Sequence, residues 1–335
     1  MSTLITVGGS SSTGTGTTFG DLIEKVYRRV MGGLRERTVQ LSVHSVSTDS
    51  TVTVIGPQAS SIAPGVMLAV ELELMYVTAW NSNTNVATVQ RGYLGSVASD
   101  HPVNTTCYIN PRYSRYDIGV AINDDLRSLS SPTNGLFRVG VAEITYNSVF
   151  QGYDLGDLPD NFIDVLEIRY RIAPPFRTFP AIKHWKVIRW DKNSTDPVFP
   201  SGRGLVIHEG AWPGLPIYVT YSAPFIRFTD TNDSVYSTPA TNDEAPPLNG
   251  YPNSMVTNLT PTMIDIPVLG AEIDLTLPRE ISRNFMESQP DPRKAQEVTP
   301  GAVAGSVNAL VMRRAQRISE EADRLQRQYT RLRGW

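Results

Sequence analysis

The stretch that decides the fold spans residues 71–111 and reads ELELMYVTAWNSNTNVATVQRGYLGSVASDHPVNTTCYINP. Apolar and polar residues alternate through residues 71–80 and again through 85–91, as they do in half-buried strands. The Asn, Ser and Thr residues between these runs have the composition of a turn. Gly92 and Gly95 then allow a tight corner that larger residues disfavour. These features predict a β-hairpin that continues through a glycine-containing corner into a further strand.

The same period of two extends towards the N-terminus of this stretch. Residues 38–54 alternate between apolar and polar side chains, and residues 66–80 are expected to form strand structure with a bend near Glu71. Together these runs predict a small antiparallel β-barrel or sandwich over residues 38–112.

Two polar side chains in this module have a predicted structural role. We expect Arg91 to bind carbonyl groups at loop ends or a carboxylate such as Asp100. His101 precedes Pro102, and we expect it to lock a loop by hydrogen bonding rather than to bind a metal. The residues alone therefore indicate a β-turn-β module with a structural function.

Helical periodicity appears on both sides of the module, so the fold class is expected to be α+β, with β modules inserted around a few helices. Asp21 opens one amphipathic helix, and Ser114 is the expected N-cap of a second one over residues 115–130. The predicted order is a flexible Gly/Ser/Thr arm (1–18), a helical core (19–37 and 113–131) around the β module (38–112), a second β-rich region with a long loop (132–260), a helix (261–287), a linker (288–301) and a long C-terminal helix (302–335).

The C-terminal helix has a narrow apolar seam and basic flanks. Its apolar residues recur at alternating spacings of four and three, which is the heptad pattern of a docking or coiled-coil helix. Such a helix either folds back on the core of its own chain or docks on a partner, and we expect docking. The residues expected to carry it are Arg313, Arg314, Arg317, Ile318, Ala322, Arg324, Leu325, Arg327, Tyr329 and Leu332.

The amino-acid composition excludes several classes of function for this protein. The chain has 335 residues and a formal net charge of −3, which gives the body no long-range attraction for nucleic acid. A single cysteine, Cys107, excludes an intrachain disulfide. The first residues lack the basic and apolar regions of a secretion signal, and no apolar run is long enough to span a membrane. We therefore expect a soluble protein made in a reducing cytoplasm, without membrane contact.

No catalytic, cofactor or metal motif assembles in the sequence. Gly9 and Gly14 have the spacing of a phosphate-binding loop, but Thr15 stands where that loop needs its lysine. Cys107 lies in a strand-like run, where a buried inert thiol is the usual state. The histidines are too widely spread to share a metal; they are His44, His101, His184 and His208. We expect no catalysis, no cofactor and no metal.

The β module resembles one that recurs in neck proteins of tailed bacteriophages. The similarity rests on a set of residues at characteristic spacings that ends in Asn-Pro-Arg. One of them, Ser96, stands where those neck proteins more often have threonine. The helix over residues 117–129 and the Arg/Glu-rich C-terminal helix are also similar to elements of head-to-tail connector, or portal adaptor, proteins of actinobacterial phages. The matching residues are Glu73, Met75, Val77, Val89, Arg91, Gly92, Gly95, Ser96, Ala98, His101, Asn110, Pro111 and Arg112.

This resemblance implies a structural virion protein. It would form a ring, of twelve copies in the family, between the portal protein and the tail, contact other neck or tail proteins, and line part of the channel for packaged DNA. The C-terminal helix would dock on the portal, and the protein would reside in the virion neck after synthesis in the host cytoplasm. The β region over residues 131–260 is larger than in compact adaptors, which leaves a tail-facing or decorating role open.

A different class of function is carbohydrate binding by a decorating tail or virion protein. Five aromatic residues in the second β region are candidates for stacking on sugar rings, although aromatic residues in strands more often belong to the core. They are Trp185, Trp190, Trp212, Tyr218 and Tyr221.

Overall fold

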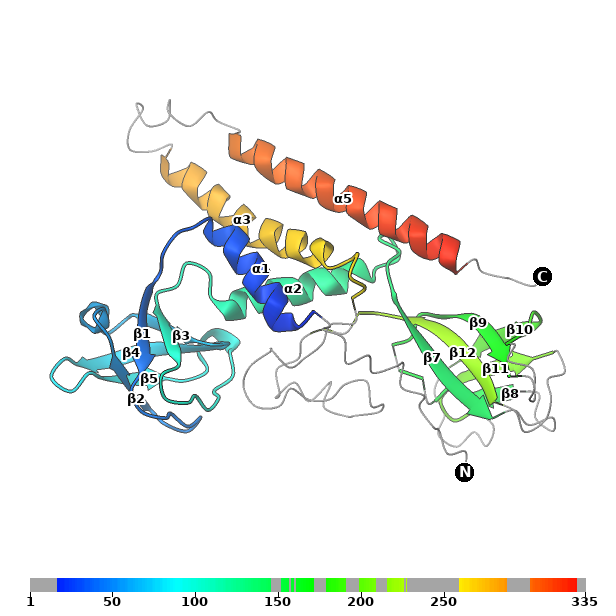
Figure 1. Ribbon diagram of the computed structural model, residues 1–335, viewed down its shortest axis with the longest axis horizontal. Helices are drawn as coiled ribbons and strands as arrows, with labels where there is room; N and C mark the ends of the chain where they lie inside the picture. Colours follow the sequence, from blue (N-terminus) through cyan, green and yellow to red (C-terminus); the bar gives the residue numbers. More distant parts are fainter. Residues whose placement is uncertain are drawn as a thin grey trace.

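The protein is an α+β structure in which a layer of helices joins two β modules (Figure 1). The computed structural model describes residues 17–145, 152–156, 158–159, 161–171, 179–190, 199–208, 216–225, 227, 259–287 and 302–329. Most of the expected arm (1–18), the whole linker (288–301) and Leu332 lie outside these residues. Thr18, assigned to the arm, instead caps the first helix.

The predicted barrel is confirmed, and it is closed. Its strands are all antiparallel and pair in the order β1-β2-β5-β4-β3-β6. The bend expected near Glu71 separates β3 from β4, and Glu71 adopts a positive φ of 54°. Alternate side chains of the strands fill the interior. The strands are β1 (Arg37–Leu41), β2 (Thr51–Ile55), β3 (Met67–Val70), β4 (Glu73–Asn81), β5 (Val86–Gln90) and β6 (Thr106–Ile109).

Among the described residues, four helices form the central layer: α1 (Phe19–Met31), α2 (Arg115–Leu129), α3 (Asp265–Glu287) and α5 (Ala302–Gln328). A capping box between Thr18 and Asp21 starts α1, and Ser114 caps α2 as predicted. The helix α3 packs against each of the other three, so α5 lies on the outside of the layer (Figure 1).

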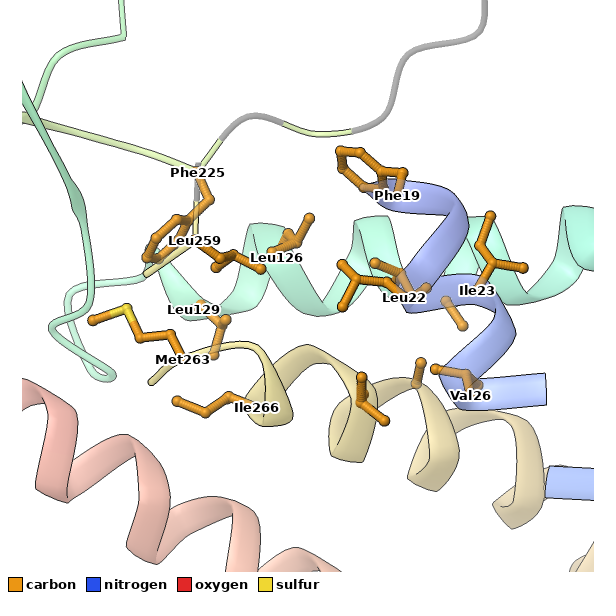
Figure 2. Packing of buried hydrophobic residues seen from close by; sticks show 14 of the residues in the cluster. Phe19, Leu22, Ile23, Val26, Leu126, Leu129, Phe225, Leu259, Met263 and Ile266 are labelled. Carbon is orange, nitrogen blue, oxygen red and sulfur yellow. The ribbon is translucent and has the colours of Figure 1, made fainter. Parts of the chain in front are cut away.

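One apolar core holds this layer together. Figure 2 shows side chains of α1 meeting those of α2 and α3, with Phe225 and Leu259 closing the core beside Leu126. Burial of such side chains contributes roughly 1.5–3 kcal/mol each relative to exposure. The labelled core residues are Phe19, Leu22, Ile23, Val26, Leu126, Leu129, Phe225, Leu259, Met263 and Ile266.

The second β region consists of two three-stranded antiparallel sheets, ordered β7-β12-β9 and β10-β11-β8, that share one apolar core. Five of its strands agree with the sequence pattern, and β8 is one that the pattern did not reveal. The strands are β7 (Arg138–Thr145), β8 (Gly152–Asp154), β9 (Asp164–Tyr170), β10 (Trp185–Arg189), β11 (Arg203–Ile207) and β12 (Pro216–Ala223).

Candidate functional site

Arg91 lies at the centre of a buried polar network at one end of the barrel. Its guanidinium donates to both carboxylate oxygens of Glu73, from Nε to Oε1 at 2.5 Å and from Nη2 to Oε2 at 2.7 Å. It also donates to Ser45 Oγ (2.9 Å) and to the carbonyls of Val46 (2.7 Å) and Ser99 (2.6 Å). The Glu73 side chain is 0% exposed and that of Arg91 is 8% exposed. The pair is therefore shielded from solvent and fully hydrogen-bonded on the guanidinium side.

The predicted carbonyl partners of Arg91 are thus confirmed, whereas the suggested carboxylate partner was wrong. Asp100 instead accepts a hydrogen bond from the backbone N–H of Ser47 at 2.6 Å. Glu73 was not predicted as the partner of Arg91, because it lies on the preceding strand and not near Arg91 in the sequence. Pairing of β4 with β5 brings it beside the end of β5, immediately before Arg91.

His101 locks the loop after β5, as expected. Its Nε2 lies 2.8 Å from Glu73 Oε2, and its Nδ1 lies 3.1 Å from Glu71 Oε2. Its backbone also forms a two-way bridge with Ser45. Burial alone would lower the pKa of His101, but hydrogen bonds and charge from Glu71 and Glu73 outweigh it and raise the pKa. Each ring nitrogen of His101 therefore faces a carboxylate oxygen, an arrangement that stabilises the protonated ring.

The same hydrogen bonds and charges shift the pKa of Glu73 in the opposite direction. Burial would raise the pKa of Glu73, yet the hydrogen bonds from Arg91, His101 and the Ser99 backbone lower it. Gly92 contributes a further backbone N–H at 3.2 Å from Glu73 Oε1. Its φ of 61° is left-handed, and a side chain there would lie 3.0 Å from the Ser96 carbonyl. Glycine is therefore required at this corner.

Gly95 links the corner to the helical layer. It has a φ of 85°, and a Cβ at this position would lie 3.3 Å from the hydroxyl oxygen of Tyr116 on α2. A second contact between barrel and helices was not apparent in the sequence. Arg115 pairs with Glu24 of α1 at 2.7 Å and lies over the rings of Tyr27 and Tyr108. These contacts fix the barrel against the helices.

The network predicts a specific pH dependence of stability. Because the pKa of His101 is higher in the folded chain than the unfolded value of 6.5, its stabilising contribution is complete below pH 6.5 and is lost as pH rises through the folded pKa. We expect the free energy of unfolding to fall by at most about 1.4 kcal/mol per pH unit over that interval.

His101→Gln should flatten this slope of the unfolding free energy against pH, as measured by urea unfolding from pH 6 to 9. His44→Gln, an exposed loop position, should leave it unchanged, and an unaltered slope in the His101 variant would contradict the assignment.

The C-terminal helix is part of the chain's own core over much of its length, which corrects the expectation of a helix free to dock. Ile318 is 7% exposed and Leu325 is 4% exposed, and both belong to the helical core. Ala322 and Tyr329 pack partly buried against the same core. The seam therefore faces inward, since a heptad pattern does not distinguish a chain's own core from a partner.

Three of the predicted docking arginines have partners within the chain. Arg317 binds Asp265 at 2.9 Å, Glu320 at 2.6 Å and Glu321 at 3.4 Å, all on α3 or on α5 itself. Arg324 binds Glu321 at 2.8 Å, and Arg314 binds Asp125 of α2 at 2.5 Å.

The other two predicted arginines, Arg313 and Arg327, are both exposed on α5, and Arg327 also interacts with another residue of the chain. Met312, next to Arg313, is 72% exposed. The solvent-facing side of α5 is therefore a mixture of apolar and basic side chains.

A groove of about 660 Å³ lies between α2, α3 and α5. The ion pair of Arg314 and Asp125 crosses it, with Arg314 Nη2 also 2.9 Å from Ser128 Oγ. Burial raises the pKa of Asp125 to about 6, although the charge and hydrogen bond of Arg314 oppose this rise. Asp125 Oδ2 and Arg314 Nε are buried without a hydrogen-bond partner among the described residues. The neighbouring Asp124 is exposed, so the two carboxylates do diverge.

The aromatic residues of the second β region do not share one exposed surface. Tyr221 is buried at 5% exposure, and Trp185 packs partly buried against the same core. Trp190 and Tyr218 make edge contacts with Phe199 and Phe179 respectively. Trp212 lies outside the described residues. The positions of Tyr221 and Trp185 favour the core interpretation over a platform for sugar rings, whereas Trp190 is 37% exposed.

Chemistry-bearing groups elsewhere are few. Cys107 is buried in the barrel, and burial raises the pKa of its thiol to about 12, which makes it inert as a nucleophile. Within the described ranges, no group of three or more His, Cys, Asp or Glu side chains has the arrangement of a metal site. None of the helices in those ranges combines the length and apolar character needed to cross a bilayer. No model of a known protein family matches the chain, and no curated protein sequence matches it.

Proposed function

We propose that the chain is a structural virion protein without catalytic activity, a head-to-tail adaptor that forms a ring between the portal and the tail of a tailed phage. The observation that supports this most strongly is the buried network of Arg91, Glu73 and His101. The residues on which the resemblance to phage neck proteins rests build the barrel and its junction with the helices. This use of the residues in the architecture of the fold supports a structural role for the chain.

The outer side of α5 is the proposed portal-binding surface. Met312 offers exposed apolar area, and Arg313 offers a planar cation beside it. Interfaces are enriched in methionine and arginine, and arginine pairs with carboxylates at two points. A closed ring repeats each such contact around its axis, so one contact need not be large. Arg313 is also the candidate for facing DNA in the channel.

Charge reversal on this surface tests the proposal. Met312→Glu with Arg313→Glu should weaken attachment to portal rings at least tenfold, because it replaces an apolar and a basic contact with two carboxylates. The measurement is mass photometry of the variant mixed with portal rings. Deletion of residues 302–335 is a poorer test, since it would also remove Ile318 and Leu325 from the core.

A matched control carries the same kind of change on the second β region. Val141→Glu with Lys186→Glu alters two exposed positions there and should leave portal attachment intact. Equal attachment by both variants would show that α5 is not the portal-binding surface.

A further inference from the structure

The groove between α2, α3 and α5 is acidic at its rim and apolar along its walls. Asp124, Asp274 and Asp323 line it and are exposed. Among the residues that the structure describes, none of these three has a cationic partner. With Asp125 and the single cation Arg314, the lining carries four carboxylates against one guanidinium. The groove therefore attracts positive charge.

The walls of the groove also expose apolar surface. Leu277 is 45% exposed and Val311 is 44% exposed, and they lie on facing helices, α3 and α5. Ile273 and Ile318 extend this surface inward. Exposed apolar side chains on two sides of a groove, rimmed by polar groups, are typical of a surface that binds a helix or peptide.

The ion pair across the groove is incompletely satisfied. Asp125 Oδ2 lacks a donor and Arg314 Nε lacks an acceptor among the described residues, and Asp125 is only 9% exposed. Buried polar atoms without hydrogen-bond partners reduce stability. Binding is therefore favoured for a molecule that supplies a donor to Asp125 Oδ2 and, once Arg314 rotates, an acceptor to Arg314 Nε. A peptide has both, in its basic side chains and its backbone carbonyls.

We propose that this groove is a docking site for a segment of a partner protein in which lysine or arginine alternates with aliphatic residues. The aliphatic side chains would lie on Leu277 and Val311, and the cations would pair with the aspartates of the rim. Charge complementarity selects this occupant over an acidic or purely apolar one. The site is distinct from the solvent-facing side of α5, and it does not depend on the adaptor role.

A synthetic amphipathic peptide of leucine and lysine, acetylated and amidated, tests the site on the full-length protein. We expect it to shift the methyl resonances of Ile273, Leu277, Val311 and Ile318. The affinity should fall at least tenfold in the exposed double variant Asp274→Asn/Asp323→Asn and should weaken as salt is raised. A peptide with glutamate in place of lysine should not bind.

The matched control is Glu143→Gln with Glu167→Gln, which removes the same charge from the β7-β12-β9 sheet and should leave binding unchanged. Three results would overturn the proposal. The first is the absence of methyl shifts, as expected if water alone fills the groove. The second is an equal loss of affinity in the control. The third is a concentration-dependent shift of the same methyl groups without peptide, which would identify a second copy of the chain as the occupant.

Discussion

Replacing Arg91 with alanine is expected to destabilise the protein by about 4 kcal/mol, because removing one member of a buried ion pair leaves the other charge without compensation. Glu73 would remain fully buried, with His101 as its remaining side-chain partner. The carbonyls of Val46 and Ser99 would lose their guanidinium donor at the same time. Urea unfolding followed by circular dichroism measures the loss, and hydrogen exchange of barrel amides should locate it in β4, β5 and the loop before β6.

Two further variants test whether the loss of stability comes from breaking this network or from removing any arginine. Arg91→Lys should recover little stability, since an ammonium cannot make the two-point contact with Glu73. Arg29→Ala removes an exposed arginine whose ion pair with Glu272 spans 3.5 Å, and it should change stability by less than about 0.5 kcal/mol. A comparable loss in Arg29→Ala, or a small one in Arg91→Ala, would show that the network is not a main support of the barrel.

Replacing Gly270 with alanine is expected to cost about 3 kcal/mol, although alanine favours a helix more than glycine does. A Cβ at this position of α3 would lie 1.9 Å from Asp125 Oδ1 and 2.1 Å from its Cγ. The carboxylate of Asp125 must then move, which breaks its ion pair with Arg314 and separates α5 from α2. Thermal unfolding and protection of α5 amides from exchange measure this effect.

Gly305→Ala is the matched control for that prediction. Gly305 lies on α5, and a Cβ there has no neighbour within 4 Å. The same substitution should therefore leave stability unchanged or raise it by up to about 1 kcal/mol. If both variants gained stability, the close approach of α3 to Asp125 would be contradicted.

The sequence pattern predicts the barrel well, because its strands are short, antiparallel and filled by alternate side chains. Val39, Leu41, Val52 and Val54 follow the expected period and are buried. The bend near Glu71 was also indicated, although nothing in the pattern revealed its positive φ. Helix caps are local contacts, which is why Ser114 could be recognised directly, whereas α1 begins at Phe19 with Thr18 as its cap and not at Asp21 as expected.

Contacts between distant parts of the chain were not predictable in the same way. Arg314 and Asp125 are separated by 189 positions, and only the packing of three helices brings them together. The C-terminal helix shows the same limit. Its seam marked Ile318 and Leu325 as contact residues, but it was wrong about the partner, since they pack in the chain's own core and periodicity does not distinguish the two cases. In the folded chain, the buried residues of the helix mark its internal side, and its exposed residues mark the side available to a partner.

The proposed adaptor role requires the chain to attach to a portal ring and to form a ring itself. Mass photometry of the purified wild-type protein, alone and mixed with tailed-phage portal rings, tests this role most directly. We expect portal rings to gain a discrete mass equal to a whole-number multiple of the 36.9 kDa chain, and that multiple gives the copy number. Intact portal rings that gain no mass at micromolar concentrations of the chain would contradict the adaptor role.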